Sequence, residues 1–157
     1  MPDLDDLYAM RVIGEALAIG VTVSTFTKRD LDELTSELRA TRTGGAAERA
    51  QAHRRFHALL RTGGGPRLRE HLDRLFEHAE RYRLAYSEPD AAAAREKYRE
   101  HVEILDACRA GHATVARDLL IDHVAGTAIT LMTRQRYAPF ALPTAITMAK
   151  SGATAAA

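Results

Sequence analysis

Apolar residues recur at the three- and four-residue spacing of an α-helix through most of this chain, and no segment shows the sustained alternation expected of a strand. Near the amino terminus the pattern predicts a helix over about residues 3–24, from a stripe made of Leu4, Leu7, Met10, Ile13, Leu17 and, at its end, Val21. A second helix is expected after Thr27, an N-cap residue with Asp30 three positions later. Its apolar positions continue to Leu38 before Gly44 and Gly45 interrupt it.

Glycine and proline divide the remainder into four more helices, expected over about residues 46–61, 66–86, 90–110 and 113–134. The run of glycines at 63–65 ends the first of these, and Pro66 suits the first turn of the next. Ser87, Glu88 and Pro89 are expected to form a turn, with Asp90 as the following N-cap. The pattern predicts an all-α bundle of about six helices in one domain over residues 1–136, followed by a partly ordered tail over residues 137–157.

Composition and charge narrow the class of protein. The 157 residues suffice for one domain with a full core, and the apolar fraction of 46% with 27% charged residues is typical of a globular protein. Lys and Arg number 22 against 21 Asp and Glu, so we expect no direct nucleic-acid binding. The amino terminus is acidic, unlike a signal or transit peptide. We expect no membrane span, which would need an apolar run of roughly 18–20 residues. The single cysteine cannot form an internal disulfide. These features favour a cytoplasmic protein without a membrane partner.

The candidate chemistry depends on histidines. His53 and His57 lie four residues apart on an expected helix, which places both imidazoles on one face about 6 Å apart, close enough to share one metal ion. His101 and His123 stand among core-facing residues of two later helices, where an unpaired imidazole would lose its hydrogen bonds to water. Three helices can therefore direct four imidazoles into one cavity. The alternative is a surface pair at 53 and 57 with two hydrogen-bonded core histidines, and the spacing alone does not decide. The remaining histidines are expected on the surface without a role: His71, His78 and His112.

Four segments, DLYAMRVIGEAL, HRRFHALLRTGGGPRL, EHVEILDACRAGH and ARDLLIDHV, resemble the FCD domain in order and spacing over about residues 4–132. This domain is the effector-binding, C-terminal domain of a large subgroup of GntR-type bacterial transcription regulators. The resemblance implies an antiparallel bundle of six or seven helices, in agreement with the six expected from the pattern, and it implies a homodimer.

The resemblance also implies a divalent metal site. In the family a D-x-x-F-H motif, a histidine before an apolar pair and a histidine on the last helix often bind one metal, and here they correspond to His53, His57, His101 and His123. His53 stands where the family usually has Asp. Four nitrogen ligands favour Zn, Ni, Cu or Fe, with Mn as a further candidate, over Mg or Ca. Fewer carboxylates also leave a dicationic site that should attract an anion more strongly.

Arg11 matches an arginine that faces the effector cavity in the family, and a guanidinium beside a metal suits a bidentate carboxylate ligand. The alternative is an outward side chain in a salt bridge with Glu15, four residues later. Arg81 and Arg83 are weaker candidates for an inward position.

Three functions remain open from the sequence. The first is a sensor module, in which the metal anchors a small carboxylate and the helices shift in response. The chain opens almost at the first FCD helix, and the sequence shows no DNA-binding domain that would recognise an operator, so we expect a sensing role without direct DNA binding. The second is a stand-alone metalloenzyme acting on a small carboxylate-bearing substrate. Its catalytic residues are unknown, with Glu15, Glu103 and Tyr8 as unspecific candidates for an acid or base. The third is a helical partner-binding domain in which the histidines are incidental. We expect the sensor.

Overall fold

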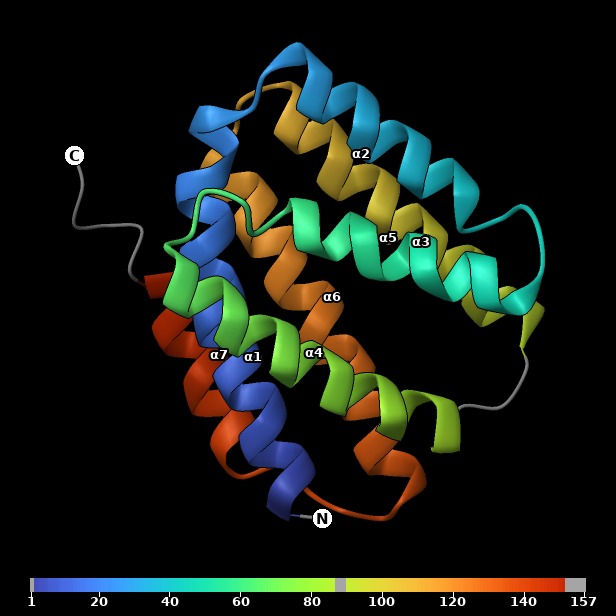
Figure 1. Cartoon of the computed structure of the whole chain (residues 1–157). Coiled ribbons are helices and arrows are strands. Elements are labelled where there is room, and N and C mark those ends of the chain that lie inside the picture. The colour runs from blue at the N-terminus through green and yellow to red at the C-terminus, as the bar shows by residue number, and fades with distance from the viewer. Residues whose placement is uncertain (1, 87–89, 152–157) are drawn as a thin grey trace.

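The computed structural model describes residues 2–86 and 90–151, and within these ranges the chain forms helices and no strand (Figure 1). This confirms the all-α prediction, whereas the turn expected at residues 87–89 lies outside the described residues. The helices closely follow the expected boundaries, with one addition near the carboxyl end. They are α1 (Pro2–Thr22), the 3-10 turn η1 (Val23–Thr25), α2 (Lys28–Ala40), α3 (Ala46–Leu59), α4 (Pro66–Tyr86), α5 (Ala91–Arg109), α6 (Ala113–Arg134) and α7 (Ala141–Ser151).

Side-chain caps fix two of the helix starts that the sequence predicts. The Thr27 hydroxyl accepts a hydrogen bond from the backbone N–H of Asp30 at 3.3 Å, and the Asp30 carboxylate accepts one from the backbone of Thr27 at 2.8 Å. This reciprocal capping box begins α2. Asp90 begins α5 by accepting from the backbone N–H of Ala92 at 2.8 Å. At the junction of α5 and α6, Gly111 has a φ of +69°, a conformation that glycine adopts without strain.

Helix α1 has two apolar faces, and the structure buries only one of them. Leu4 and Leu7 of the expected stripe are buried, but the other four positions are exposed: Met10 by 47%, Ile13 by 45%, Leu17 by 59% and Val21 by 43%. The core face of α1 shares Leu4 with the expected stripe and continues through Tyr8, Val12 and Ile19. The prediction of one stripe was therefore wrong, because helical periodicity identifies the helix but does not choose between two apolar faces.

Because both faces of α1 carry apolar residues, the segment Pro2–Thr25 is apolar enough, as well as long enough, to resemble a membrane-crossing helix. Within the fold, however, 61% of its most apolar window is buried, because α1 packs against α4, α6 and α7. A buried core helix has the same length and composition as a membrane span, so this feature is weak support for a membrane location.

A seventh helix, α7, lies within the segment 137–157 that the sequence analysis expected to be a partly ordered tail. Ala141–Ser151 form a helix that packs along α1, with Leu142 and Ala145 buried (Figure 1). Its amino terminus is capped from the other end of the sequence, because the buried carboxylate of Asp5 accepts hydrogen bonds at 2.8–3.0 Å from three backbone N–H groups, those of residues 140, 141 and 142. No local N-cap signal was therefore needed. The domain boundary at residue 136 stays a prediction.

The helices form two groups that meet around a polar interior. In one group α4, α6 and α7 pack against α1, and in the other α2 packs against both α3 and α5, while α5 also contacts α6 and joins the groups (Figure 1). Most of the buried polar and charged side chains come from helices lining this junction, or from the residues just after them: Arg11, Glu15, His57, Arg61, His101 and His123. Because burying polar groups costs free energy unless they find partners, this concentration indicates a functional site.

Candidate metal centre

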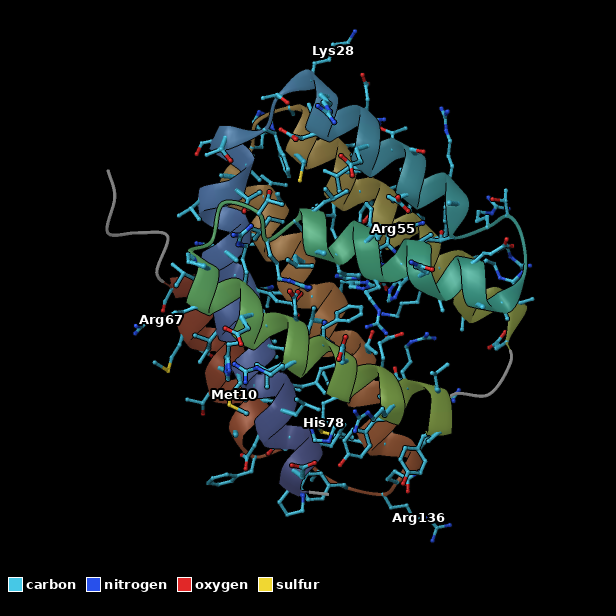
Figure 2. The ribbon with its side chains drawn as sticks, viewed as in Figure 1. Met10, Lys28, Arg55, Arg67, His78 and Arg136 are labelled. Carbon is cyan, nitrogen blue, oxygen red and sulfur yellow. The ribbon has the colours of Figure 1, made fainter. Side chains whose placement is uncertain are left out.

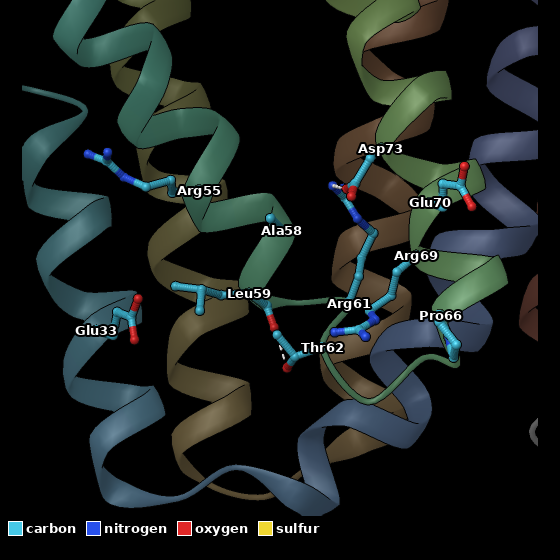
Figure 3. A pocket seen from close by; sticks show the side chains of 10 residues that line it. All are labelled: Glu33, Arg55, Ala58, Leu59, Arg61, Thr62, Pro66, Arg69, Glu70 and Asp73. Atoms are coloured by element: carbon cyan, nitrogen blue, oxygen red, sulfur yellow. Dashed lines mark hydrogen bonds and ion pairs between the residues drawn. The ribbon is translucent and has the colours of Figure 1, made fainter.

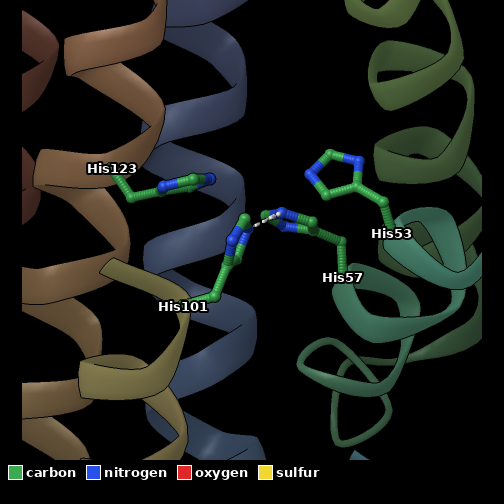
Figure 4. A group of neighbouring side chains, drawn as sticks. All are labelled: His53, His57, His101 and His123. Atoms are coloured by element: carbon green, nitrogen blue, oxygen red, sulfur yellow. Dashed lines mark hydrogen bonds between the residues drawn. The ribbon is translucent and has the colours of Figure 1, made fainter. Parts of the chain in front are cut away.

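Four histidines from three helices converge at this junction. His53 and His57 come from α3, His101 from α5 and His123 from α6, and Figure 4 shows their rings around one common space. One nitrogen from each ring can be chosen so that all four lie within 4.8 Å of one another. His57, His101 and His123 are buried, and the His53 side chain is 21% exposed. The structure therefore brings together all four histidines that the sequence predicted, on the expected helices.

The separation of one pair of nitrogens suits ligation of a single transition metal. The Nε2 atoms of His57 and His101 are 3.1 Å apart. With metal–nitrogen bonds of about 2.0–2.1 Å, two ligand nitrogens would be about 2.9 Å apart at a right angle and about 3.4 Å apart at a tetrahedral angle. The observed separation lies between these values. Four neutral imidazoles also form the kind of nitrogen donor set that Zn, Ni and Fe accept and that Mg and Ca avoid.

Burial keeps the four imidazoles neutral, as metal ligation requires. Desolvation lowers the pKa of His53 to about 4, with the Glu80 carboxylate opposing this shift. Desolvation likewise lowers the pKa of His57, His101 and His123 well below the ordinary value. The positive charge that any one protonated ring would carry lowers the pKa of its neighbours further.

Three glutamates lie behind the histidines, on the side away from the common space. Glu100 Oε2 is 2.6 Å from Nδ1 of His123. Glu80 Oε2 is 3.8 Å from Nδ1 of His53, and Glu15 Oε2 is 3.9 Å from Nδ1 of His57. The sequence analysis considered Glu15 only as an unspecific acid or base and missed the other two. No signal in the sequence marks them, because they are three among many glutamates on helix surfaces.

Arg11 lies inward, as the family resemblance implied, and it also forms the ion pair with Glu15 that was the alternative. Its side chain is buried, and its Nε donates to Glu15 Oε1 at 2.7 Å. Burial opposes the charged form of Arg11, but Glu15 outweighs this effect and raises the pKa of the guanidinium. The Phe76 ring separates Arg11 from the histidines, with its centroid 5.1 Å from the Arg11 Cζ and 5.2 Å from the His57 ring.

The other residues considered from the sequence divide between the interior and the surface. Tyr8 is buried with its ring 5.2 Å from the Arg11 Cζ, and burial raises the pKa of its hydroxyl. Glu103 pairs with Arg99 on its own helix, away from the histidines. Arg83 contacts the site indirectly, through its two hydrogen bonds to Glu80 at 2.8 Å. Four residues are exposed: His71, His78, Arg81 and His112.

A surface groove of about 470 Å³ lies between α2, α3 and α4, and none of the four clustered histidines lines it (Figure 3). Arg61 connects the groove to the interior. Its Nη2 donates to Asp73 at 2.7 Å in the groove, while its Nη1 is 4.0 Å from Glu15 Oε2. The sequence analysis gave Arg61 no role, and it is one of the largest fully buried side chains among the described residues.

A helical bundle in which four histidines converge, three of them buried, is compatible with binding of a metal ion. The sequence model of the FCD domain family matches residues 6–126, which is most of the chain. The chain therefore belongs to the FCD domain family, whose members serve as effector-binding domains in GntR-type regulators. Comparisons with curated proteins and with solved structures found no match.

Proposed function

We propose that this chain is a metal-dependent sensor: the effector-binding domain of a GntR-type transcription regulator, with a small carboxylate as the effector. The observation that carries the proposal is the convergence of four imidazoles, three of them buried, with buried Arg11 on the other side of the Phe76 ring. His53, His57, His101 and His123 would hold one divalent ion, with Zn, Ni, Fe and Mn as the candidates. The proposal includes a cytoplasmic location, and it includes the expectation that this chain does not itself bind nucleic acid.

The charges around the histidines support an anionic effector. Four cations and four carboxylates surround the cluster or pair with its neighbours: Arg11, Arg61, Arg83 and Lys97 against Glu15, Glu80, Glu100 and Asp73. These charges balance one to one. A divalent ion among neutral imidazoles would therefore leave two positive charges uncompensated in a buried site, and an anion would compensate them.

Arg11 is placed to orient such an anion. Its hydrogen bond to Glu15 uses Nε, and among the described residues its two terminal nitrogens have no hydrogen-bond partner. Two terminal N–H groups match a carboxylate bidentately. When bound, the metal would supply positive charge and, if it accepts five or six ligands, open positions for the anion. Because its ligands come from α3, α5 and α6, an effector at this point would favour one arrangement of these helices over another, as a sensor requires.

The effector class can be tested with the metal-loaded protein and pairs of matched probes. We expect carboxylates of two to six carbons to raise the thermal midpoint, while the corresponding amides do not, because only the acids carry the compensating charge. Stabilisation should grow as RT ln(1 + [L]/Kd), or about 2.7 kcal/mol at one hundred times Kd. Arg11→Ala should reduce this shift and keep the metal. Equal stabilisation by acids and amides would contradict the role of Arg11.

The same incubations separate a sensor from an enzyme. A sensor returns the stabilising carboxylate chemically unchanged, with or without oxygen, as mass spectrometry of the incubated ligand would show. Metal-dependent conversion over many turnovers per chain would instead establish the stand-alone metalloenzyme and overturn the sensor.

The homodimer is also part of the proposal, and the exposed apolar row of α1 fits a second copy of the chain. Asp6 continues the row of Met10, Ile13, Leu17 and Val21 towards the amino terminus at helical spacing. The start of α4 lies at the opposite end of the row, because Gly63 N–H donates to Thr22 Oγ1 at 3.0 Å, and exposed Arg67 follows there. Figure 2 shows Met10 and Arg67 towards the same edge of the molecule. Antiparallel pairing about a two-fold axis would bring the acidic end of one row to the basic end of the other.

Size-exclusion chromatography with light scattering, which measures the molar mass of the eluted protein, tests this interface. We expect the wild type at about twice the chain mass of 17.3 kDa, and Leu17→Glu as a monomer, because a charge at the centre of the row would be buried without a partner. Val115→Glu is the matched control, since Val115 is a similarly exposed apolar residue on α6 and should leave the dimer intact. A monomeric wild type, or a dimeric Leu17→Glu variant, would contradict the α1 interface.

A further inference from the structure

Three of the four histidines each take part in an arrangement of the same kind, made of a histidine, a glutamate and a cation. The Nδ1 atom of the histidine faces the glutamate, and the glutamate also forms an ion pair with the cation. The three arrangements are His123 with Glu100 and Lys97, His53 with Glu80 and Arg83, and His57 with Glu15 and Arg11. The glutamates come from three different helices, α5, α4 and α1. Each glutamate pairs with its cation three or four residues away on its own helix, but its histidine lies on another helix, so the histidine–glutamate contacts depend on how the helices pack.

The Glu100 arrangement is complete in the structure. Its Oε2 lies 2.6 Å from Nδ1 of His123, and both of its oxygens accept from Lys97 Nζ, at 2.9 and 3.1 Å. The histidine is on α6, whereas the glutamate and lysine are on α5. The Nδ1 side of His123 is thus occupied, and its Nε2 is the nitrogen left for another partner.

The Glu15 arrangement contains buried atoms without hydrogen bonds, and Glu15 Oε2 also lies 4.0 Å from Arg61 Nη1. Among the described residues, Nδ1 of His57 and Oε2 of Glu15 are both buried without a hydrogen bond, and they lie 3.9 Å apart. Nδ1 of His53 is likewise buried without a hydrogen bond, 3.8 Å from Glu80 Oε2. Leaving such groups buried and unpaired is unfavourable, so a small side-chain movement that joins each pair is favoured.

A carboxylate behind a neutral imidazole determines which ring nitrogen carries the proton. A neutral imidazole has one N–H donor and one acceptor nitrogen, and an ionised carboxylate only accepts. The nitrogen that faces the carboxylate must therefore be the N–H, and Nε2 presents its lone pair to the common space. Each of the three carboxylates is also paired with a cation, as an ionised carboxylate would be.

We infer that Glu15, Glu80 and Glu100 are positioning residues, which hold His57, His53 and His123 with Nδ1 protonated and Nε2 directed at the metal. This inference rests on the proposed metal site. Ordinary surface ion pairs are the competing explanation, but the other paired glutamates among the described residues have no ion pair with a histidine. This holds for a pair within one helix, such as Glu96 with Arg99, and for a pair between helices, such as Glu77 with Arg54.

Cobalt(II) titration of the full chain tests the inference, because the intensity and position of the cobalt absorption bands report the ligand geometry. We expect Glu100→Ala to weaken cobalt binding by about 10–100-fold, the usual effect of removing an outer-shell partner of a ligating histidine, and to change the spectrum. Glu100→Gln should recover part of the affinity and most of the wild-type spectrum, because its amide oxygen can still accept from Nδ1–H of His123. Glu96→Ala, an exposed glutamate on the same helix, is the matched control and should bind as the wild type.

The outcomes distinguish this inference from the function on which it rests. Wild-type protein that binds no cobalt would remove the metal site, and the positioning role with it. Wild-type binding together with unchanged binding by Glu100→Ala would overturn the positioning role alone. Equal losses in Glu100→Ala and Glu100→Gln, or a similar loss in Glu96→Ala, would assign the effect to charge and also overturn it. Glu80→Ala, with exposed Glu77→Ala as its control, repeats the test at His53, so the result does not depend on one variant folding.

Discussion

Replacing His57 with alanine is expected to remove the metal from the purified protein. The wild type should carry about one divalent transition metal per chain after dialysis, measured by elemental analysis of protein prepared without added nickel. His57 is the most buried of the four proposed ligands, and its Nε2 is 3.1 Å from that of His101. Its replacement therefore removes a nitrogen donor from the middle of the cluster. Removing a direct ligand should cost more than the roughly 10–100-fold in affinity that outer-shell partners contribute.

His71→Ala is the matched control for this experiment, because it also removes one imidazole from a helix but from an exposed position on α4. It should leave both the metal content and the thermal midpoint unchanged. Circular dichroism of His57→Ala shows whether the helices remain, which separates loss of the ligand from loss of the fold. Metal-free wild-type protein whose thermal stability does not change on adding zinc would contradict the metal site and leave four core histidines.

The sequence predicted the convergence of the four histidines better than it predicted the packing around them. A four-residue spacing on a helix fixes the relative positions of His53 and His57, and the core-facing positions of His101 and His123 made them candidates before the family resemblance favoured the same set. The glutamates behind the rings depend on how α1, α4 and α5 are placed around α3 and α6. That placement is tertiary information, which the periodicity of a single helix does not contain.

The two errors about the fold have the same origin. The start of α7 was missed because its cap is Asp5, more than 130 positions away in the sequence, whereas sequence rules look for a cap next to the helix. The exposed row of α1 was assigned to one stripe with Leu4 because nothing local distinguishes a core face from an apolar face kept for a partner.

The buried histidines should make the metal-free protein unstable in mild acid. His53 has a pKa of about 4 in the folded protein, against about 6.5 in an unfolded chain, and the other three rings are shifted in the same direction. The unfolded chain therefore binds more protons between these values, and the free energy of unfolding rises with pH across that window. This stability is fully present above pH 6.5 and is lost as the pH falls towards 4.

The size of the effect is large compared with the stability of a typical domain. At pH 5 the shift of His53 alone costs about 2 kcal/mol, and the other three histidines add to it, against a total of roughly 5–15 kcal/mol. Denaturant unfolding of chelator-treated protein between pH 5 and 7 measures the slope directly, in a range where most carboxylates stay ionised. Added zinc should move the loss of stability to lower pH, because ligation competes with protonation of the same nitrogens.

A variant with one buried imidazole fewer gives the decisive comparison. His57→Leu keeps an apolar side chain at the buried position but removes one site that takes up a proton on unfolding. Its free energy of unfolding should therefore fall less steeply as the pH drops from 6.5 to 5, by up to one proton, or about 1.4 kcal/mol per pH unit. His71→Ala should keep the wild-type slope. If the metal-free wild type were equally stable at pH 5 and pH 7, the imidazoles would have to be hydrated in the folded state, and the closed, neutral centre described above would be wrong.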